Sequence, residues 1–280
     1  MDSSIQEDNI EIMEILVPEI LKNGKDYTSF SDIKDCIECP FRYKLKHIDK
    51  IEIDDKTEHT FFGGALHEAC EDYLKTRIMK YEIALDKIVI EWTLRQYKDM
   101  GNWMLQSNAI LKEVPKWFDI RFPGWEFISS EERFKETISD KTDILLKGFI
   151  DGVIFHDGYY YIFDWKTSTK GWNDYKKEKD KTTRLQLLLY TIAWSKKFNI
   201  PFNKIKLGFV ILIRDLTMPQ RIDFFEFEFS DKDINYAIET FNKTIKIIQG
   251  KYQFKIWKYE EPKFMKGCRF CKYNGTKHCP

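Results

Sequence analysis

The sequence predicts an α/β protein: a helical N-terminal region, a core in which strands and helices follow one another, and a C-terminal tail that carries cysteines. Three observations support this. A chain of 280 residues with 43% hydrophobic and 16% aromatic residues can bury a sizeable core, in one large domain or two small ones, and is not disordered over most of its length. Apolar residues follow helical spacing before Pro123-Gly124 and strand-like patterns after it. The six cysteines gather towards the two ends.

Residues 1–28 are predicted to form an acidic N-terminal arm. Residues 1–20 hold six acids and no Lys or Arg, whereas a signal peptide begins with a basic region. No stretch approaches the roughly 20 apolar residues that a membrane span needs. We therefore expect a cytoplasmic protein without membrane contact, whose arm could mask a basic groove or bind a protein partner.

Residues 29–124 are predicted to be a helical region. Ser31 is a plausible N-cap for a helix that Pro40 interrupts, and residues 54–60 form a polar loop. Gly63-Gly64 opens a helix expected to run to about Lys80. Two further helices are expected over 84–98 and 102–120.

Residues 125–250 are predicted to form the α/β core. Asp157-Gly158, between two apolar runs, predicts a tight β-hairpin. Ser230-Asp231 is expected to cap the last helix. The expected strands cover 125–138, 144–155, 159–165, 204–213 and 222–229, and the expected helices cover 182–198 and 231–249.

The strongest candidate site lies on the predicted hairpin. Strand alternation places Asp164 and Lys166 on one face and Trp165 on the other, and the hairpin brings Asp151 beside them. Two carboxylates and an ammonium suit a divalent cation such as Mg²⁺ or Mn²⁺, which could activate water against a phosphodiester. The structural alternative is an ordinary surface ion pair.

Polar side chains elsewhere could join this site. Gln186 and Tyr190 are four residues apart, hence on one helical face, although Tyr190 could equally be packed at the core edge. Arg184 and Lys170 belong to the stretch 166–184, which has a net charge of +4. His67 could be a ligand, although a lone histidine is more often structural.

The formal charge of the whole chain is zero, so only local patches can indicate a polyanionic partner. Besides 166–184, residues 251–280 carry a net charge of +6 and form a basic, cysteine-bearing tail. In this tail Cys268 and Cys271 form a CxxC motif that Cys279 follows, and Cys39 is the candidate fourth ligand for a [4Fe–4S] cluster or Zn²⁺. Cys36 and Cys39 could instead form a CxxC motif of their own and make a four- or five-thiolate zinc site with the tail, and His278 is a weaker substitute ligand. Free thiols are the alternative.

Together these motifs resemble those of the PD-(D/E)xK nuclease superfamily, and specifically of RecB-like exonucleases such as the CRISPR-associated exonucleases. The motifs occur in the family's order over residues 29–280: the opening from Ser31 to Tyr43, GxxxH ending at His67, GxxD ending at Asp151, DxK from Asp164 to Lys166, QxxxY from Gln186 to Tyr190, and the cysteine tail.

The resemblance implies a restriction-endonuclease-like mixed central sheet flanked by helices. It also implies that His67, Asp151, Asp164 and the carbonyl of Trp165 hold the metal, with Lys166 as catalytic lysine. Gln186 and Tyr190 would support the site or the DNA, and either Glu131 or Glu132 would be the upstream acid. It further implies that a [4Fe–4S] cluster is ligated by four cysteines, Cys39, Cys268, Cys271 and Cys279. The seven residues between the last two cysteines are a wider gap than the family pattern has.

The resemblance therefore implies a metal-dependent DNA nuclease, and we expect a single-strand exonuclease of repair, recombination or phage DNA metabolism. The substrate would be single-stranded or end-containing DNA. Two alternatives stay open: a DNA-binding module that uses the same fold without cleavage, and a structure-selective endonuclease with the same chemistry.

Overall fold

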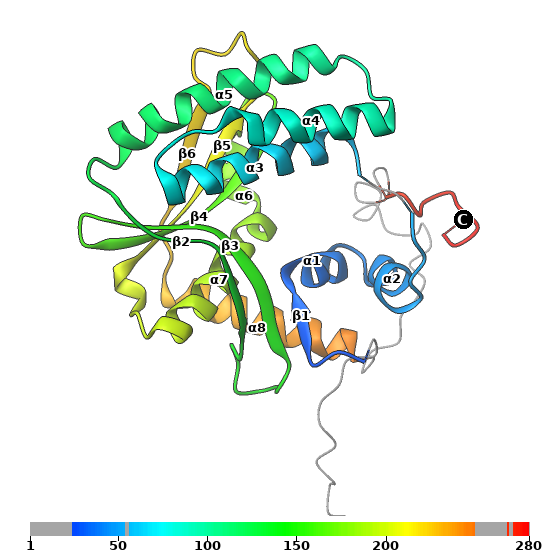
Figure 1. Cartoon of the computed structure of the whole chain (residues 1–280). Coiled ribbons are helices and arrows are strands. Elements are labelled where there is room, and N and C mark those ends of the chain that lie inside the picture. Colours follow the sequence, from blue (N-terminus) through cyan, green and yellow to red (C-terminus); the bar gives the residue numbers. More distant parts are fainter. Residues whose placement is uncertain (1–23, 54–55, 250–267, 269–270, 280) are drawn as a thin grey trace, which may run out of the picture.

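The computed structural model describes residues 24–53, 56–249, 268 and 271–279. A mixed six-stranded sheet lies at its centre with helices on both faces (Figure 1), so the predicted α/β fold with a restriction-endonuclease-like sheet is confirmed. Residues 1–23, which are most of the predicted acidic arm, lie outside the described residues. So do residues 251–267 of the predicted basic tail.

The sheet has the strand order β1-β3-β4-β5-β6, with β2 pairing β3 on the other edge. β3 runs antiparallel to β2 and β4, β4 runs parallel to β5, and β5 runs antiparallel to β6. The strands are β1 (Tyr27–Ser29), β2 (Glu126–Glu136), β3 (Leu145–His156), β4 (Tyr159–Ser168), β5 (Ile205–Ile213) and β6 (Ile222–Phe227).

One edge of β3 is shared between two strands. β1 runs parallel to residues 145–147, and β4 runs antiparallel to residues 152–156. β1 and β4 therefore diverge along residues 148–151, a stretch that ends at Asp151. We call this point the fork of β3, and it is where the candidate site lies.

The helices form two layers. On one face lie α3 (Glu58–Thr76), α4 (Tyr81–Arg95) and α5 (Met100–Arg121), whose apolar side chains share a core with Phe163, Trp165 and Val210 of the sheet. On the other face lie α1 (Phe30–Glu38), α7 (Lys181–Phe198) and α8 (Asp231–Ile248), which share a second core with Ile150 and Ile162. Figure 1 shows the two layers on opposite sides of the sheet.

Short elements complete the chain. These are α2 (Pro40–Tyr43), a π-helical turn (Lys44–Ile48), α6 (Asp174–Lys179) and a 3₁₀ turn (Phe202–Lys204). Among the described residues, no helix combines the length and the apolar character that crossing a bilayer demands.

Two predicted helix starts are wrong. α1 is capped by Ser29, not Ser31: the Ser29 and Asp32 side chains make reciprocal capping hydrogen bonds, while Ser31 is exposed. α3 begins at Glu58, within the predicted loop, because Thr57 and Thr60 form a capping box, and it ends at Thr76. Gly63-Gly64 is therefore helix interior. An added Cβ on Gly63 would lie 3.4 Å from Oγ1 of Thr167, so this glycine faces the end of β4.

The predicted hairpin is confirmed. Asp157 and Gly158 connect β3 and β4 with positive φ angles of 49° and 78°, as a type I′ turn requires. The capping of α8 by Ser230 is also confirmed. The strand β1 and the helix α6 were not predicted.

Candidate active site

The residues of the predicted hairpin site converge at the fork of β3. Asp164 and Lys166 project from one face of β4, while the Trp165 side chain is fully buried against Phe163 and Phe118 on the opposite face. Asp151 lies at the diverging edge of β3, where one of its oxygens, Oδ2, accepts a hydrogen bond of 2.9 Å from the Trp165 backbone N–H. The Asp151 carboxylate thus accepts a backbone hydrogen bond that the carbonyl of a neighbouring strand would otherwise accept.

Two side chains from the helical layers complete the cluster. His67, in α3, lies over Asp151, with 3.6 Å between Nδ1 and Oδ2. Gln186, in α7, donates from Nε2 to Oδ1 of Asp164 at 2.7 Å. Lys166 Nζ lies 2.5 Å from Asp164 Oδ2 and donates to Gln186 Oε1 at 3.2 Å. The structure therefore brings together five of the predicted residues, from α3, β3, β4 and α7.

Burial controls the charge state of this cluster. It lowers the pKa of His67 to about 4, with a further contribution from Lys166, although Asp164 and a hydrogen bond with the Trp165 backbone oppose the shift. The imidazole is therefore neutral at pH 7 and free to act as a ligand. Burial, together with Asp164, raises the pKa of Asp151 well above its usual value. Although burial lowers the pKa of Lys166, the charges of Asp164 and Asp151 outweigh it and raise that pKa.

Tyr190 packs beneath the site. Its ring lies edge-to-face with Phe134 at 5.2 Å between centroids, and burial raises the pKa of its hydroxyl although Gln186 opposes the shift. Gly148 permits this packing, because a Cβ there would lie 2.6 Å from Cζ of Phe134 and 3.0 Å from Cε1 of Tyr190. The glycine of the GxxD motif is thus required by a close approach of two rings to β3.

The two candidate upstream acids face different surroundings. Glu132 pairs with Lys197 at 2.6 Å. Glu131 has a left-handed backbone (φ 49°) and faces Glu71, one helical turn beyond His67 in α3. Burial and the nearby Glu131 raise the pKa of Glu71 to about 8. Glu131 also contributes to the raised pKa of Asp151, so it is the acid whose charge reaches the site.

Two predicted residues lie elsewhere. The guanidinium of Arg184 stacks over Phe227 and Phe225, at 4.7 and 5.5 Å from the ring centroids, on β6. Lys170 is exposed in the loop after β4, where its charge acts on Asp215. Net charge along the chain, which singled out this stretch, does not report the direction of a side chain.

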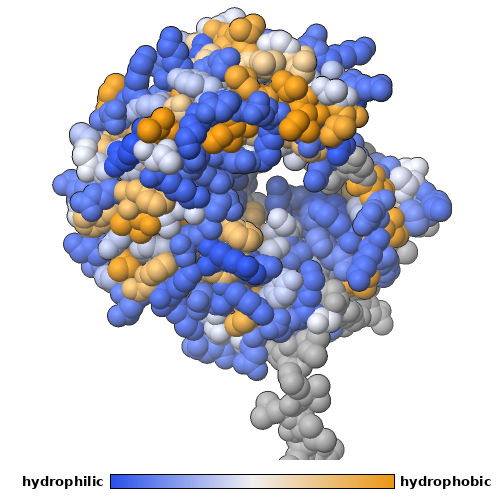
Figure 2. All heavy atoms as spheres, viewed as in Figure 1, coloured by the Kyte–Doolittle hydropathy of each residue, from blue (hydrophilic) through white to orange (hydrophobic). Residues whose placement is uncertain are grey.

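A groove runs from this site to the C-terminal tail. It is a cavity of about 760 Å³ that has Lys166 and Gln186 at one end, α1 and the residues before α3 along its walls, and Cys271 and Tyr273 at the other end. We call it the basic groove, because five cations line it against two acids: Lys34, Arg42, Lys46, Lys166 and Lys272 against Asp35 and Glu38. Figure 2 shows an opening with largely hydrophilic walls in this region.

The four predicted cluster cysteines share a second cavity. Cys39, Cys268, Cys271 and Cys279 line a space of about 40 Å³ between α2 and the tail, which we call the cysteine pocket. All four are free thiols, and burial raises the pKa of Cys268 and Cys279, with a further contribution from the other thiols of the pocket. Cys36, the alternative ligand, is instead packed in the core with Ile33, where burial raises its pKa to about 12.

In both clusters the candidate ligand side chains are spread more widely than the ligands of a metal ion. Among the side chains described, no three of His, Cys, Asp and Glu approach closely enough to form a metal site. At the fork of β3, the Lys166 ammonium lies against Asp164, where it neutralises one of the two carboxylates. A divalent ion would therefore compete with Lys166 for Asp164.

Comparisons with known proteins give the family of the chain and a likeness of fold. The model of the PD-(D/E)XK nuclease superfamily matches residues 27–276. A solved structure from Eubacterium rectale, assigned provisionally as an exonuclease, superposes with a TM-score of 0.53 at 13% identity, covering 90% of this chain and 89% of that chain, which is a likeness of fold. The structure of SSO0001 is 18% identical, with a TM-score of 0.36 over 84% of this chain and 91% of that one, and supports no argument. No curated protein matches the chain in sequence.

Proposed function

Because the chain belongs to the PD-(D/E)XK nuclease superfamily and is a nuclease by that membership, we propose that it is a metal-dependent deoxyribonuclease that degrades single-stranded DNA from an end. The observation that carries this proposal is the meeting of His67, Asp151, Asp164 and Lys166 at the fork of β3. The helix α3 and the β3–β4 hairpin, which lie far apart in the sequence, supply them, whereas a chance surface ion pair would need only the hairpin.

The donor set suits a hard divalent cation. His67, Asp151, Asp164 and the backbone carbonyl of Trp165 would hold Mg²⁺ or Mn²⁺, with one nitrogen and otherwise oxygen ligands. The bound ion would supply an activated water and neutralise charge on the scissile phosphate. A neutral His67 fits this role, because its pKa of about 4 leaves the ring nitrogen unprotonated at pH 7.

The other side chains of the site orient its charged groups and balance their charge. Lys166 keeps its proton and can stabilise the negative charge that develops on the phosphate. Gln186 holds both Asp164 and Lys166, so it fixes the distance between the carboxylate and the ammonium. Tyr190 lies one helical turn after Gln186 in α7, and Gln186 acts on the pKa of its hydroxyl. We assign Gln186 and Tyr190 to site support on these contacts.

The basic groove supports a single-stranded, end-containing substrate. Its cations offer sites for successive phosphates beside Lys166. α1 and α3, on either side of the groove, are joined by the chain between Asp49 and Thr57, and the Tyr273 hydroxyl donates to the Ile51 carbonyl at 2.7 Å. A DNA strand lying in the basic groove would have α1 on one side and the start of α3 on the other, which favours entry of a free end.

The test is degradation of labelled single-stranded, double-stranded and circular single-stranded DNA, and of RNA, with Mg²⁺ or Mn²⁺. Asp164→Asn should abolish cleavage, while Asp140→Asn, at an exposed position before β3, should retain it. Cleavage of circular single strands would instead support an endonuclease. Salt-dependent DNA binding without cleavage under any metal would support the non-cleaving DNA-binding module.

We further propose that the cysteine pocket holds a [4Fe–4S] cluster, with Zn²⁺ as the competing occupant. Four thiols around one small cavity match the ligand set of either centre. Such a centre would link α2 to the tail. Metal analysis of anaerobically purified protein decides between them: equimolar zinc without iron would defeat the cluster, and no metal at all would defeat both.

A further inference from the structure

One arginine near the candidate active site has no acidic partner among the described residues. Arg214 directly follows β5, and its backbone N–H donates to the Ser168 carbonyl, at the end of β4, at 2.9 Å. β4 and β5 run parallel, so Arg214 lies at the carboxyl end of the strand beside the one that carries Asp164 and Lys166. In α/β sheets, ligands commonly bind beyond the carboxyl ends of parallel strands.

The guanidinium of Arg214 contacts two side chains from different elements. Its Nη2 donates to Oγ1 of Thr169 at 2.7 Å, and its Cζ lies 5.0 Å from the ring centroid of Trp103, in α5. A guanidinium has five N–H donors, and Thr169 is its one hydrogen-bond partner in the described structure. Most of its donors are therefore left for a ligand.

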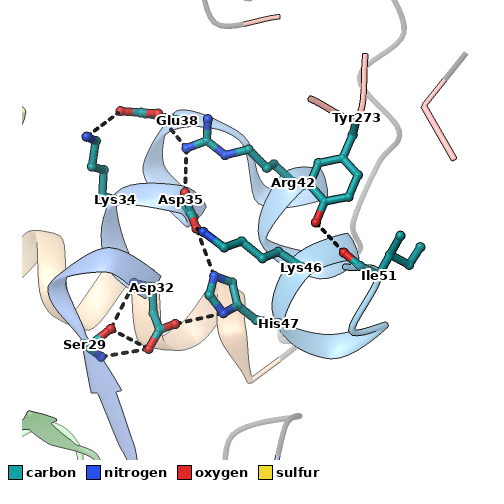
Figure 3. Close-up of polar contacts among 10 residues, drawn as sticks. All are labelled: Ser29, Asp32, Lys34, Asp35, Glu38, Arg42, Lys46, His47, Ile51 and Tyr273. Atoms are coloured by element: carbon teal, nitrogen blue, oxygen red, sulfur yellow. Dashed lines mark hydrogen bonds and ion pairs between the residues drawn. The ribbon is translucent and has the colours of Figure 1, made fainter. Parts of the chain in front are cut away.

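Arg42, in the basic groove, shows how an arginine of this protein is ordinarily neutralised. Its Nη2 lies 2.8 Å from Asp35 Oδ1 and 2.6 Å from Glu38 Oε2. Figure 3 shows this guanidinium beside the two carboxylates. Around Arg214, by contrast, the described chain places no carboxylate at ion-pair distance.

The charge of Arg214 is partly buried without compensation. Burial lowers the pKa of Arg214, and no charged group of the described chain opposes this shift. The next residue, Asp215, instead turns its carboxylate to the backbone N–H and the hydroxyl of Thr217, at 3.0 and 2.7 Å. Removing a charge from water without a counter-charge is costly, so this arrangement indicates an anion that the described chain does not supply.

The helix α3 connects this arginine with the fork of β3. His67, Gly63 and His59 are spaced four residues apart, so they lie along one face of α3, over about 12 Å. His67 lies at the fork, Gly63 faces the end of β4, and the His59 ring lies 5.2 Å from Trp103 between centroids. Burial and the charge of Arg214 lower the pKa of His59, which places the two side chains close together.

The strand β4 makes the same connection. Thr169, which holds Arg214, follows Lys166 by three residues, a span of at most about 11 Å. Thr60, the neighbour of His59, lines the basic groove together with Lys166. An anion bound by Arg214 would therefore lie near the Lys166 end of the basic groove.

We propose that Arg214 is a phosphate-binding residue of the nuclease site: its guanidinium binds a backbone phosphate of the DNA strand close to the scissile phosphate, while Thr169 and Trp103 hold the guanidinium in place. Arginine suits this role, because its planar N–H donors match pairs of phosphate oxygens. The inference rests on the proposed nuclease function and adds a substrate contact outside the basic groove, which Arg214 does not line.

The experiment is a salt titration of the binding of labelled single-stranded DNA to the full chain in the Asp164→Asn background, where cleavage should be abolished. The logarithm of the binding constant falls with the logarithm of salt concentration, by about 0.7 for each phosphate of a single strand that the protein neutralises. We expect Arg214→Gln to reduce this slope by about 0.7 and to weaken binding about 10-fold or more. Arg214→Lys should keep the slope, because it keeps the charge, and bind with intermediate affinity.

Arg121→Gln is the matched control. Arg121 also lies over an aromatic ring, that of Phe122, with Cζ 5.0 Å from the centroid, but it has a carboxylate partner, Glu226, at 2.7 Å. It is about 27 Å along α5 from Trp103. We expect Arg121→Gln to bind DNA with the unchanged slope.

A second measurement locates the phosphate. A set of strands, each with one uncharged methylphosphonate linkage at a different position, is bound to the Asp164→Asn protein with and without Arg214→Gln. At one position we expect the uncharged linkage to weaken binding only where Arg214 is present, because the double change removes a contact already lost. If thermal unfolding shows that Arg214→Gln does not fold, Arg214→Met, which keeps a long side chain against Trp103, takes its place.

Two results would overturn the inference. A slope in Arg214→Gln equal to that of the Asp164→Asn protein would show that Arg214 braces Thr169 and Trp103 without contacting DNA. Methylphosphonate effects that are the same with and without Arg214 would exclude the phosphate contact. In either case cleavage by the wild type would leave the proposed function standing, whereas absence of both DNA binding and cleavage would refute the two together.

Discussion

Replacing Gly148 with alanine tests whether the packing beneath the fork of β3 is as tight as the structure describes. The new Cβ would lie 2.6 Å from Cζ of Phe134 and 3.0 Å from Cε1 of Tyr190. Those two rings pack edge-to-face and are both buried, so neither can swing into solvent. Adding a methyl group to a filled core costs about 1–3 kcal/mol. We expect the free energy of unfolding to fall by that amount.

Gly64→Ala is the matched control for the same chemical change. Gly64 is exposed within α3, and no atom lies within 4 Å of its added Cβ. Because alanine is the better helix former, this variant should be more stable than wild type by about 0.5–1 kcal/mol. Urea titrations of both variants in one buffer measure the two changes in the free energy of unfolding, which should have opposite signs.

Phe134→Leu in the Gly148→Ala background should relieve the clash and recover part of the lost stability, because contacting residues are energetically coupled. Gly148→Ala should also slow cleavage, since the displaced Tyr190 belongs to α7, the helix that carries Gln186. A Gly148→Ala protein as stable as wild type, or a double variant that recovers nothing, would refute the packing argument.

Two other perturbations give distinct readouts. Gln186→Leu removes the hydrogen bonds to Asp164 and Lys166 and should lower the cleavage rate at saturating Mg²⁺ about 10–100-fold; an unchanged rate would exclude Gln186 from the site. Asp35→Asn tests acid stability: burial alone would raise the pKa of Asp35, but His47, Arg42 and Lys46 hold it at about 2, below the usual 3.8. The ionised Asp35 side chain therefore stabilises the folded state by about 2 kcal/mol. This stabilisation is complete above pH 4 and is lost as the pH falls through 2. Urea titrations should show that wild type exceeds Asp35→Asn in free energy of unfolding by more at pH 6 than at pH 2.5. An equal difference at the two pH values would contradict the lowered pKa of Asp35.

Local patterns predicted the parts of the fold that depend on local physics. The turn at Asp157-Gly158 was predictable because both central residues must adopt positive φ, and few dipeptides do so readily. Strand alternation then placed Asp164 and Lys166 on one face. The hairpin core of the candidate site could therefore be read from the sequence.

Features that depend on distant partners were not predictable. β1 has three residues and forms only by pairing with residues 145–147, more than a hundred positions later. The start of α3 was missed because Gly63-Gly64 was interpreted as a helix opening, whereas the capping box at Thr57 fixes the true start. The left-handed backbone of Glu131, which turns it towards Glu71, leaves no signature in the sequence.

The cysteine pocket has a consequence for the order in which the protein matures during synthesis. Cys39 is translated well before Cys268, Cys271 and Cys279. His67, Asp151, Asp164 and Gln186 are all translated before those three, so the fork of β3 can assemble on the nascent chain while Cys39 still lacks its partners. The metal proposed for the pocket could therefore be held by all four cysteines only once Cys279 has been translated, and a chain that stalls before residue 268 would carry the residues of the fork of β3 without three of the four cysteines.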